Sequence, residues 1–167
     1  INESVESIIE MFPSLHALYI GPGLGRHSLV FKVVSQVIHK AMELELALVL
    51  DADALYMLSL NEYSKLLVEL RGYEKCVMTP NVMEMRRLND DIMSSGIGGS
   101  NNNEPAQNHS IIVQKGSVDT ISNIHSTMYC DEDGGLKRSG GIGDVLAGTI
   151  SAFMAWNTIL ETDSDNR

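Results

Sequence analysis

Short apolar runs alternate with longer amphipathic segments in the first half of the chain. His16–Ile20 (HALYI) and Leu46–Leu50 (LALVL) each predict a strand, and the second is apolar throughout, as expected of a strand buried on both faces. Between them, Ser28 is a candidate N-cap for a helix from Leu29 to Leu44. This helix is indicated by apolar residues at three- and four-residue spacing, at Val30, Val33, Val34, Val37, Ile38, Ala41 and Leu44.

The pattern continues with a second helix and a third strand. Ser59 and Glu62 suggest a capping box for a helix that runs to about Leu70, and Gly72 would end it. A short strand follows at Cys76–Met78, and Pro80 should stop it because proline has no N–H donor and a fixed φ.

The second half of the chain predicts a short helix to about Leu88, an insertion, a strand and a hairpin. Residues 90–109 are rich in Ser, Gly and Asn without a period, which indicates a flexible surface insertion. Ile111–Gln114 predicts a strand, and two further strands should pair across a turn at Asn123. Those two strands are expected at Val118–Ile121 and Ser126–Tyr129.

A glycine-rich loop and a helix complete the pattern. The loop runs from Gly134 to Gly143, the helix opens at Asp144 and reaches about Trp156, and residues 161–167 are a polar tail. Alternating strands and helices predict an α/β fold with a mostly parallel sheet and helices on both faces. In such a sheet, ligands bind beyond the carboxyl ends of the strands. Four strand-end segments should therefore converge there, namely Gly21–Arg26, Asp51–Asp53, Thr79–Arg87 and Lys115–Asp119.

Composition narrows the functional classes. The 167 residues suffice for one domain, and 44% hydrophobic residues can form a core. With 12 basic and 22 acidic residues, the net charge of −10 argues against a nucleic-acid partner. Cys76 and Cys130 form no CxxC pair, which favours a reducing compartment. The chain shows no signal peptide and no apolar run near the ~20 residues of a membrane span, so we expect a cytoplasmic protein without membrane contact. A mitochondrial pool is the alternative, since the chain begins at Ile1 and the native N-terminus is expected upstream.

Gly140-Gly141-Ile142-Gly143-Asp144 is the segment that indicates most chemistry. Glycines allow the backbone to approach a ligand, and the unpaired N–H groups at the start of a helix attract a phosphoryl group. Asp144 could then accept a proton from a substrate hydroxyl. The alternative is a surface loop whose aspartate only caps the helix. Gly148 and Ala152 further along predict that another element packs closely against the helix.

The other strand-end segments leave two interpretations open. GPGLGR (21–26) lacks the GxGxxG spacing of a dinucleotide site and could be a tight connection. Asn81 could contact a ligand or cap a helix in which Glu84 and Arg87 pair in solvent. Lys115 could bind phosphate or lie solvated in a turn. Asp51 and Asp53 could hold Mg²⁺ or cap the next helix.

Five segments together resemble the NAD(P)H-hydrate dehydratases of the ribokinase-like superfamily. The matching segments are IGPGLGR (20–26), LVLDADALYML (48–58), TPNVMEMRRL (79–88), VQKGSVD (113–119) and GGLKRSGGIGDVLAGTISAF (134–153). They come in the family's order and span nearly the whole chain, and the KRSGGIGD region is most similar to the eukaryotic, ATP-using branch. The resemblance implies a partial ribokinase-like domain at residues 1–160, incomplete at the sheet edges.

The resemblance also implies an activity and residue roles. The family phosphorylates the 6-hydroxyl of NADHX or NADPHX with ATP and Mg²⁺, then eliminates phosphate to restore NADH or NADPH. Asp144 would be the catalytic base. The hydrated nucleotide would contact Asp144 together with Gly25, Asn81, Val82, Met83, Glu84, Met85, Arg86 and Arg87. ATP would contact Lys115, Gly116, Ser117, Val118, Asp119, Gly134, Gly135, Leu136, Lys137, Arg138, Ser139, Gly140, Gly141, Ile142 and Gly143.

The chain also departs from the family. Family members usually carry Gln at the position of Ile142, and they are longer at both ends, so apolar sheet surface is expected to be exposed. Two alternatives follow: another ribokinase-like alcohol kinase, or an inactive nucleotide-binding fragment. The sequence leaves open whether the chain forms a homo-oligomer.

Overall fold

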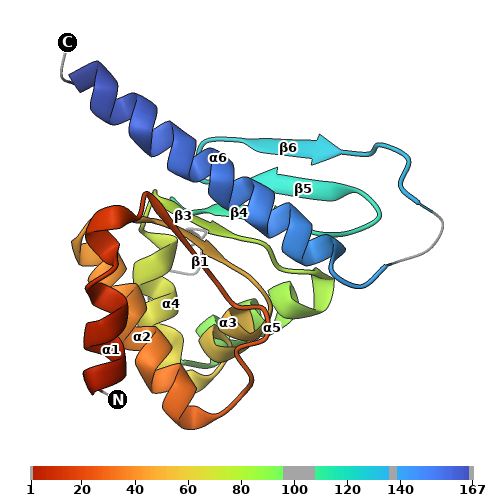
Figure 1. Cartoon of the computed structure of the whole chain (residues 1–167). Coiled ribbons are helices and arrows are strands. Elements are labelled where there is room, and N and C mark those ends of the chain that lie inside the picture. Colours follow the sequence, from red (N-terminus) through yellow and green to blue (C-terminus); the bar gives the residue numbers. More distant parts are fainter. Residues whose placement is uncertain (1, 96–107, 136–138, 166–167) are drawn as a thin grey trace.

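In the part of the chain that the structure describes, a six-stranded sheet separates five α-helices on one face from a single long helix on the other. In the computed structural model, which describes residues 2–95, 108–135 and 139–165, the strands lie in the order β1-β2-β3-β4-β5-β6 (Figure 1). The strands are β1 (Ala17–Ile20), β2 (Ala47–Leu50), β3 (Cys76–Met78), β4 (Ile111–Gln114), β5 (Asp119–Ser122) and β6 (Thr127–Cys130). The first four are parallel, and β5 and β6 continue the sheet as an antiparallel hairpin. The predicted α/β fold is confirmed.

The helices follow the amphipathic pattern, with differences at their ends. They are α1 (Asn2–Ile9), α2 (Ser28–Glu43), α3 (Ala52–Leu58), α4 (Ser64–Arg71), α5 (Val82–Ser95) and α6 (Ile142–Asp165). Short 3₁₀ turns lie at Phe12–Ser14 and Asn61–Tyr63. Helix α1 was not predicted, although Val5, Ile8 and Ile9 have helical spacing and lie against the core.

Two predicted helix starts are wrong. Ser28 does not cap α2; the Nδ1 atom of His27 accepts the hydrogen bond from the Leu29 amide at 3.2 Å. Ser59 ends α3 instead of opening a helix, because its hydroxyl donates to the Tyr56 carbonyl. The α4 helix starts only at Ser64 and ends at Gly72 as predicted.

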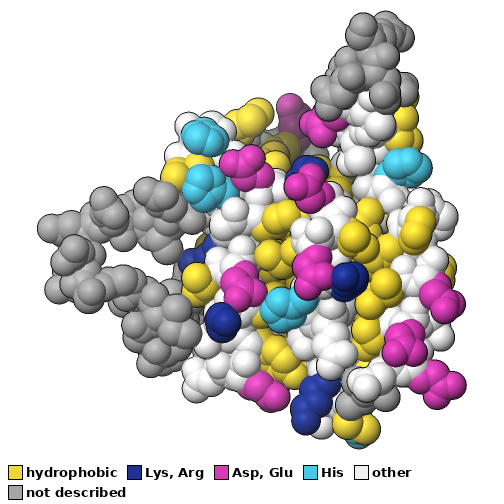
Figure 2. All heavy atoms as spheres, turned by 90° about the vertical axis from the view of Figure 1, so that its left-hand side faces the viewer, with side chains coloured by type: hydrophobic (Ala, Val, Ile, Leu, Met, Phe, Trp, Pro, Cys, Tyr) yellow, Lys and Arg dark blue, Asp and Glu magenta, His cyan; other side chains and the backbone are white. Residues whose placement is uncertain are grey.

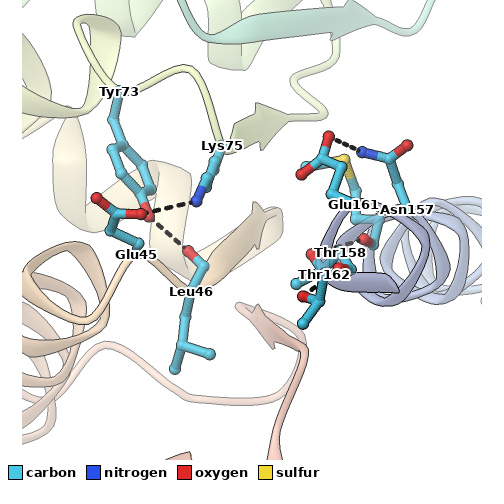
Figure 3. Close-up of polar contacts among 9 residues, drawn as sticks. Glu45, Leu46, Tyr73, Lys75, Asn157, Thr158, Glu161 and Thr162 are labelled. Carbon is cyan, nitrogen blue, oxygen red and sulfur yellow. Dashed lines mark hydrogen bonds and ion pairs between the residues drawn. The ribbon is translucent and has the colours of Figure 1, made fainter. Parts of the chain in front are cut away.

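Two helices are longer than the sequence pattern suggested. The α5 helix continues past Leu88 to Ser95, so the first residues of the predicted insertion are helical, while residues 96–107 lie outside the described residues. The α6 helix begins at Ile142 and extends beyond Trp156 into the predicted tail. Its distal end carries side-chain hydrogen bonds along the helix, such as Asn157 to Glu161 at 2.7 Å (Figure 3).

Each strand sends alternate side chains to the two layers. On one face, Leu48, Leu50 and Met78 lie in a large core with α2, α3 and α4, and on the other face Val49, Val77 and Val113 lie against Ala147 of α6. Strand β2 is buried at every residue, as its continuous apolar run predicted. The β6 strand at the far edge exposes Met128 and Tyr129, in keeping with the expectation of exposed apolar surface.

The amino ends of β2 and β3 are tied together away from the carboxyl-end rim. The Tyr73 hydroxyl donates to the Leu46 carbonyl at 2.8 Å, and Lys75 pairs with Glu45 at 3.1 Å (Figure 3). Acidic, basic and histidine side chains are interspersed with apolar ones on the side of the molecule that Figure 2 shows. Among the helices of the described segments, none is both long enough and apolar enough to cross a membrane.

Candidate active site

The predicted convergence at the carboxyl ends of the parallel strands is confirmed by backbone hydrogen bonds. The Asp51 amide donates to Ile20, the Thr79 amide to Leu50, and the Lys115 amide to Pro80. Asn81 and Lys115 also form a single parallel bridge. The segments after β1, β2, β3 and β4 therefore lie side by side as one rim.

Asp51 and Lys115 form an ion pair at the centre of this rim. Lys115 Nζ lies 2.8 Å from Asp51 Oδ1, and the side chains are 24% and 3% exposed. Charges removed from water are costly unless they are paired, so this contact stabilises both groups in place. The pair joins residues 64 positions apart in the sequence. Asp51 directly precedes α3 but makes no side-chain capping bond there, so the capping interpretation does not hold for its side chain.

Glycines allow two backbone segments to reach this pair. A Cβ on Gly21 would lie 1.8 Å from the Asp51 carbonyl oxygen, and its φ is +146°, so a side chain has no room there. A Cβ on Gly143 would lie 3.5 Å from Lys115 Nζ and 3.7 Å from Asp51 Oδ2. The first turn of α6 therefore lies directly over the Asp51–Lys115 pair.

Asp53 holds the turn that follows β1. Its carboxylate accepts a hydrogen bond from the Gly25 amide at 3.0 Å and pairs with Arg26 Nε at 3.2 Å. The Arg26 guanidinium also lies 3.9 Å from the centre of the Tyr56 ring. Gly25, predicted to contact substrate, is thus part of an ordered turn attached to α3, and Asp53 is engaged as an anchor for that turn.

Asn81 and Glu84 form a reciprocal cap at the start of α5. The Asn81 side-chain oxygen accepts from the Met83 and Glu84 amides, and Glu84 Oε2 accepts from the Asn81 amide at 2.8 Å. This is a capping box, and it bears out the capping interpretation of Asn81. Of the other residues predicted to contact substrate here, Val82 and Met83 are exposed, whereas Met85 lies against the core. Arg86 Nη1 approaches the Met83 sulfur at 4.0 Å, and Arg87 is exposed on α5.

A cavity of about 360 Å³ lies between this cap and the start of α6. It falls in the size range of small-molecule sites. The segment after β4 closes one side, where the Gly116 amide donates to Asp119 Oδ1 at 2.8 Å in a tight turn. The cavity is lined by Asn81, Lys115, Gly116, Asp119, Ser139, Ile142, Gly143 and Leu146.

The structure thus gathers part of the predicted ATP site. Six of the predicted ATP-binding residues line the cavity, and Asn81, predicted for the other substrate, lines it too. Ser117 and Val118 lie in the adjacent turn and are exposed, as are Gly134, Gly135, Gly140 and Gly141. Leu136, Lys137 and Arg138 lie outside the described residues.

Asp144 lies on the other side of the α6 start. Ala147 is fully buried against the sheet, and at about 100° per residue Leu146 and Asp144 fall on opposite sides of it. Leu146 lines the cavity, whereas Asp144 lies close enough to β1 that its charge, with that of Asp51, adds to burial in raising the pKa of Tyr19 to about 12. Asp144 itself is exposed.

The predicted close packing around Gly148 is wrong within the described residues. A Cβ on Gly148 would meet nothing within 4 Å, and Ala152 is exposed. The outward side of α6 is in fact apolar, with Phe153 and Trp156 exposed and their rings stacked 6.3 Å apart.

Two buried hydroxyl groups were missed by the sequence interpretation. Tyr19 Oη and Thr79 Oγ1 have no hydrogen-bond partner among the described residues. Both lie on the α6 face, as strand alternation requires. Val49, which pairs with Tyr19 in the sheet, lies on that face, and so does Val77, two residues before Thr79. The alternation rule could have placed them there, but Tyr19 appeared only as part of a strand and Thr79 only as the first residue of the strand-end segment Thr79–Arg87.

Comparisons with known proteins agree with this geometry. A family model described as NAD(P)H-hydrate dehydratase matches residues 2–165. Similar curated proteins are the ATP-dependent (S)-NAD(P)H-hydrate dehydratases of Ajellomyces capsulatus (40% identity, 90% of this chain, 42% of that protein) and Dictyostelium discoideum (38%, 91% and 50%). That of Rattus norvegicus is 34% identical over 93% of this chain and 46% of its own length. The chain thus spans about half the length of the curated relatives it matches.

A solved structure of a ribokinase-like superfamily protein from Enterococcus faecalis is also similar to this chain. It superposes with a TM-score of 0.71 at 27% identity, covering 92% of this chain and 52% of that one. The family model covers nearly all of the chain. The segments that resemble the family form the ends of the parallel strands, the glycine-rich turn against Asp51 and the start of α6. The chain belongs to the NAD(P)H-hydrate dehydratase family.

Proposed function

We propose that this chain provides the site for ATP-dependent dehydration of NADHX and NADPHX to NADH and NADPH. The proposal is carried by one observation: the start of α6, with Gly143, lies over the Asp51–Lys115 pair and beside a cavity, while Asp144 lies on the opposite side of the same helical turn. A phosphate donor and an alcohol acceptor could therefore meet across the first turn of one helix.

Different residues of this site would stabilise the phosphate and accept the proton during phosphoryl transfer. The γ-phosphoryl group of ATP would meet the amide groups of residues 141–144 and the Lys115 ammonium, which stabilise the charge that develops during transfer. The 6-hydroxyl oxygen attacks phosphorus, its proton passes to Asp144, and ADP leaves. The phosphate group then departs with the electrons of its C–O bond and the neighbouring carbon loses a proton to water, which restores the dihydronicotinamide ring.

The proposed substrate contacts adjoin the proposed ATP contacts. Asn81 shares a bridge and a cavity with Lys115, so the residues after β3 and those after β4 form one continuous surface. On this basis we propose Gly25 and residues 81–87 for the hydrated nucleotide, and Lys115–Asp119 with residues 134–143 for ATP.

Mg²⁺ would enter with the nucleotide. Within the described residues there is no group of three His, Cys, Asp or Glu side chains that could hold a metal. Asp51 is paired with Lys115 and Asp53 with Arg26 and the Gly25 amide, so neither carboxylate fits as a free ligand. A Mg²⁺ ion held mainly by phosphate oxygens and water fits this site better, and it would neutralise phosphate charge there.

The test supplies the chain with NADHX, ATP and Mg²⁺ and follows NADH absorbance, with the full-length Rattus norvegicus relative as the positive control. ATP-dependent recovery of NADH supports the proposal. If the control recovers NADH and this chain does not, although it is folded by circular dichroism, the chain alone is not a dehydratase. Turnover of ATP with a sugar alcohol in place of NADHX would favour a different alcohol kinase.

A further inference from the structure

Tyr19 presents a hydroxyl group that the fold buries without satisfying. Its neighbours in β1, Leu18 and Ile20, pack into the α2–α4 core, whereas the Tyr19 ring lies on the other face with Val49 and Ala147. Its Oη atom is inaccessible to solvent and has no partner among the described residues. Most buried polar groups are hydrogen-bonded, so an orphaned donor at a candidate active site requires an explanation.

The surroundings of this hydroxyl are negatively charged. Burial and the carboxylates of Asp51 and Asp144, in that order, raise the pKa of Tyr19 to about 12. The phenol therefore keeps its proton at neutral pH, and toward an anion it can act only as a hydrogen-bond donor. Asp51 is held in place through Oδ1, which accepts from Lys115 at 2.8 Å, whereas no hydrogen bond within the described chain holds either carboxylate oxygen of Asp144.

The strand arrangement places Tyr19 and Asp144 on the same face of the sheet. Tyr19 is the third of the four residues of β1 and lies on the face covered by α6, which packs along β1 and β2. Asp144 occupies the first turn of that helix, on the side away from the cavity. Its side chain is exposed, and Ala147, one turn further along α6, packs on the same face as Tyr19.

We propose that Tyr19 is a positioning residue for Asp144. Its buried hydroxyl donates a hydrogen bond to one carboxylate oxygen of Asp144 and thereby directs the other oxygen at the substrate hydroxyl. This inference rests on the proposed dehydratase function for its kinetic consequence, but the contact itself is independent of turnover.

Tyr63 offers a matched control. Its hydroxyl is likewise buried without a partner among the described residues. Its ring, however, lies in the α2–α4 core, edge-on to Phe31 with the two ring centres 6.3 Å apart. Tyr19→Phe and Tyr63→Phe therefore each remove one orphaned oxygen, and only the first lies near Asp144. Any effect of losing a buried hydroxyl in general will appear in both variants.

The first measurement follows the tyrosine Cζ resonances of the ¹³C-labelled chain at neutral pH, with and without NADHX. Tyr19→Phe assigns the Tyr19 signal. We expect Asp144→Asn to shift that signal and to leave the Tyr63 signal in place. An unchanged Tyr19 signal in both conditions overturns the proposed contact, whether or not the chain turns over NADHX.

The second measurement is the steady-state kinetics of NADHX dehydration. Tyr19→Phe should lower kcat about tenfold, as loss of one hydrogen bond to a charged group implies, with KM little changed. Kinetics equal to those of Tyr63→Phe would overturn the positioning role. Absence of turnover in the unmodified chain would instead refute the proposed function, and the resonance measurement still decides the contact.

Discussion

Lys115 and Asp51 meet at 2.8 Å across 64 residues of sequence, with the first turn of α6 above them. The contact ties the end of β4 to the end of β2 and leaves a cation facing the cavity. Its stability contribution and its proposed phosphate contact can be separated by mutation.

Lys115→Ala should lower the free energy of unfolding by about 2–4 kcal/mol, because it leaves the Asp51 carboxylate buried without its cation. Urea unfolding measures this change. The matched control is Lys75→Ala, which removes the exposed Lys75–Glu45 pair (Figure 3) and should cost less than about 1 kcal/mol. Equal losses in the two variants would show that Asp51 is not held as described.

Gly21→Ala should prevent folding or cost more than about 3 kcal/mol, because a Cβ there would overlap the Asp51 carbonyl oxygen. Gly25→Ala is the control, since its φ of +73° is strained for alanine but no atom lies within 4 Å of the added carbon. That variant should lose only about 1–2 kcal/mol. Thermal unfolding of both distinguishes a steric clash from backbone strain alone.

Asn81→Ala should destabilise the chain by about 1 kcal/mol through loss of the α5 cap. Asn81→Asp keeps an acceptor oxygen at the cap and should retain stability, but it places a negative charge beside the cavity that holds Lys115. We therefore expect the aspartate variant to bind ATP more weakly in calorimetric titration. Unaltered ATP affinity in Asn81→Asp would argue against ATP phosphates in this cavity.

Asp144→Asn should reduce kcat for NADHX dehydration by about 10²–10⁴-fold, the usual contribution of a positioned base, while ATP affinity changes little. Single-turnover kinetics and equilibrium ATP binding provide the two readouts. Its exposed position predicts little loss of stability. Near-normal turnover would remove Asp144 as the base.

Cys76 and Cys130 should react with a thiol reagent at very different rates. Cys130 is exposed, whereas Cys76 is fully buried in β3 and burial raises the pKa of its thiol. One thiol should react rapidly in the native chain, and the second only as the sheet opens. Because Cys76 lies between β2 and β4 in the sheet order, its labelling rate should track global unfolding in urea. Rapid labelling of both thiols would show that the sheet opens locally.

Much of the strand arrangement could be predicted because its causes are local. Leu46–Leu50 is apolar at every position and becomes a strand buried on both faces, and Pro80 follows the third strand as expected. Helix starts were predicted less well. Ser28 and Ser59 match the preferred capping residues, yet His27 caps α2 and Ser59 ends α3, because several polar residues compete for each helix end and local preference separates them by only about 1 kcal/mol.

By itself, the sequence determined the α/β alternation, the family and the set of strand-end segments, since these depend on residue order and short-range pattern. Only the tertiary structure decided which polar groups are partners. It paired Asp51 with Lys115, assigned Asp53 to the Gly25–Arg26 turn, and placed Tyr19 beneath Asp144's helix. These contacts join residues from different strands, and their strength comes from burial, which sequence spacing does not encode.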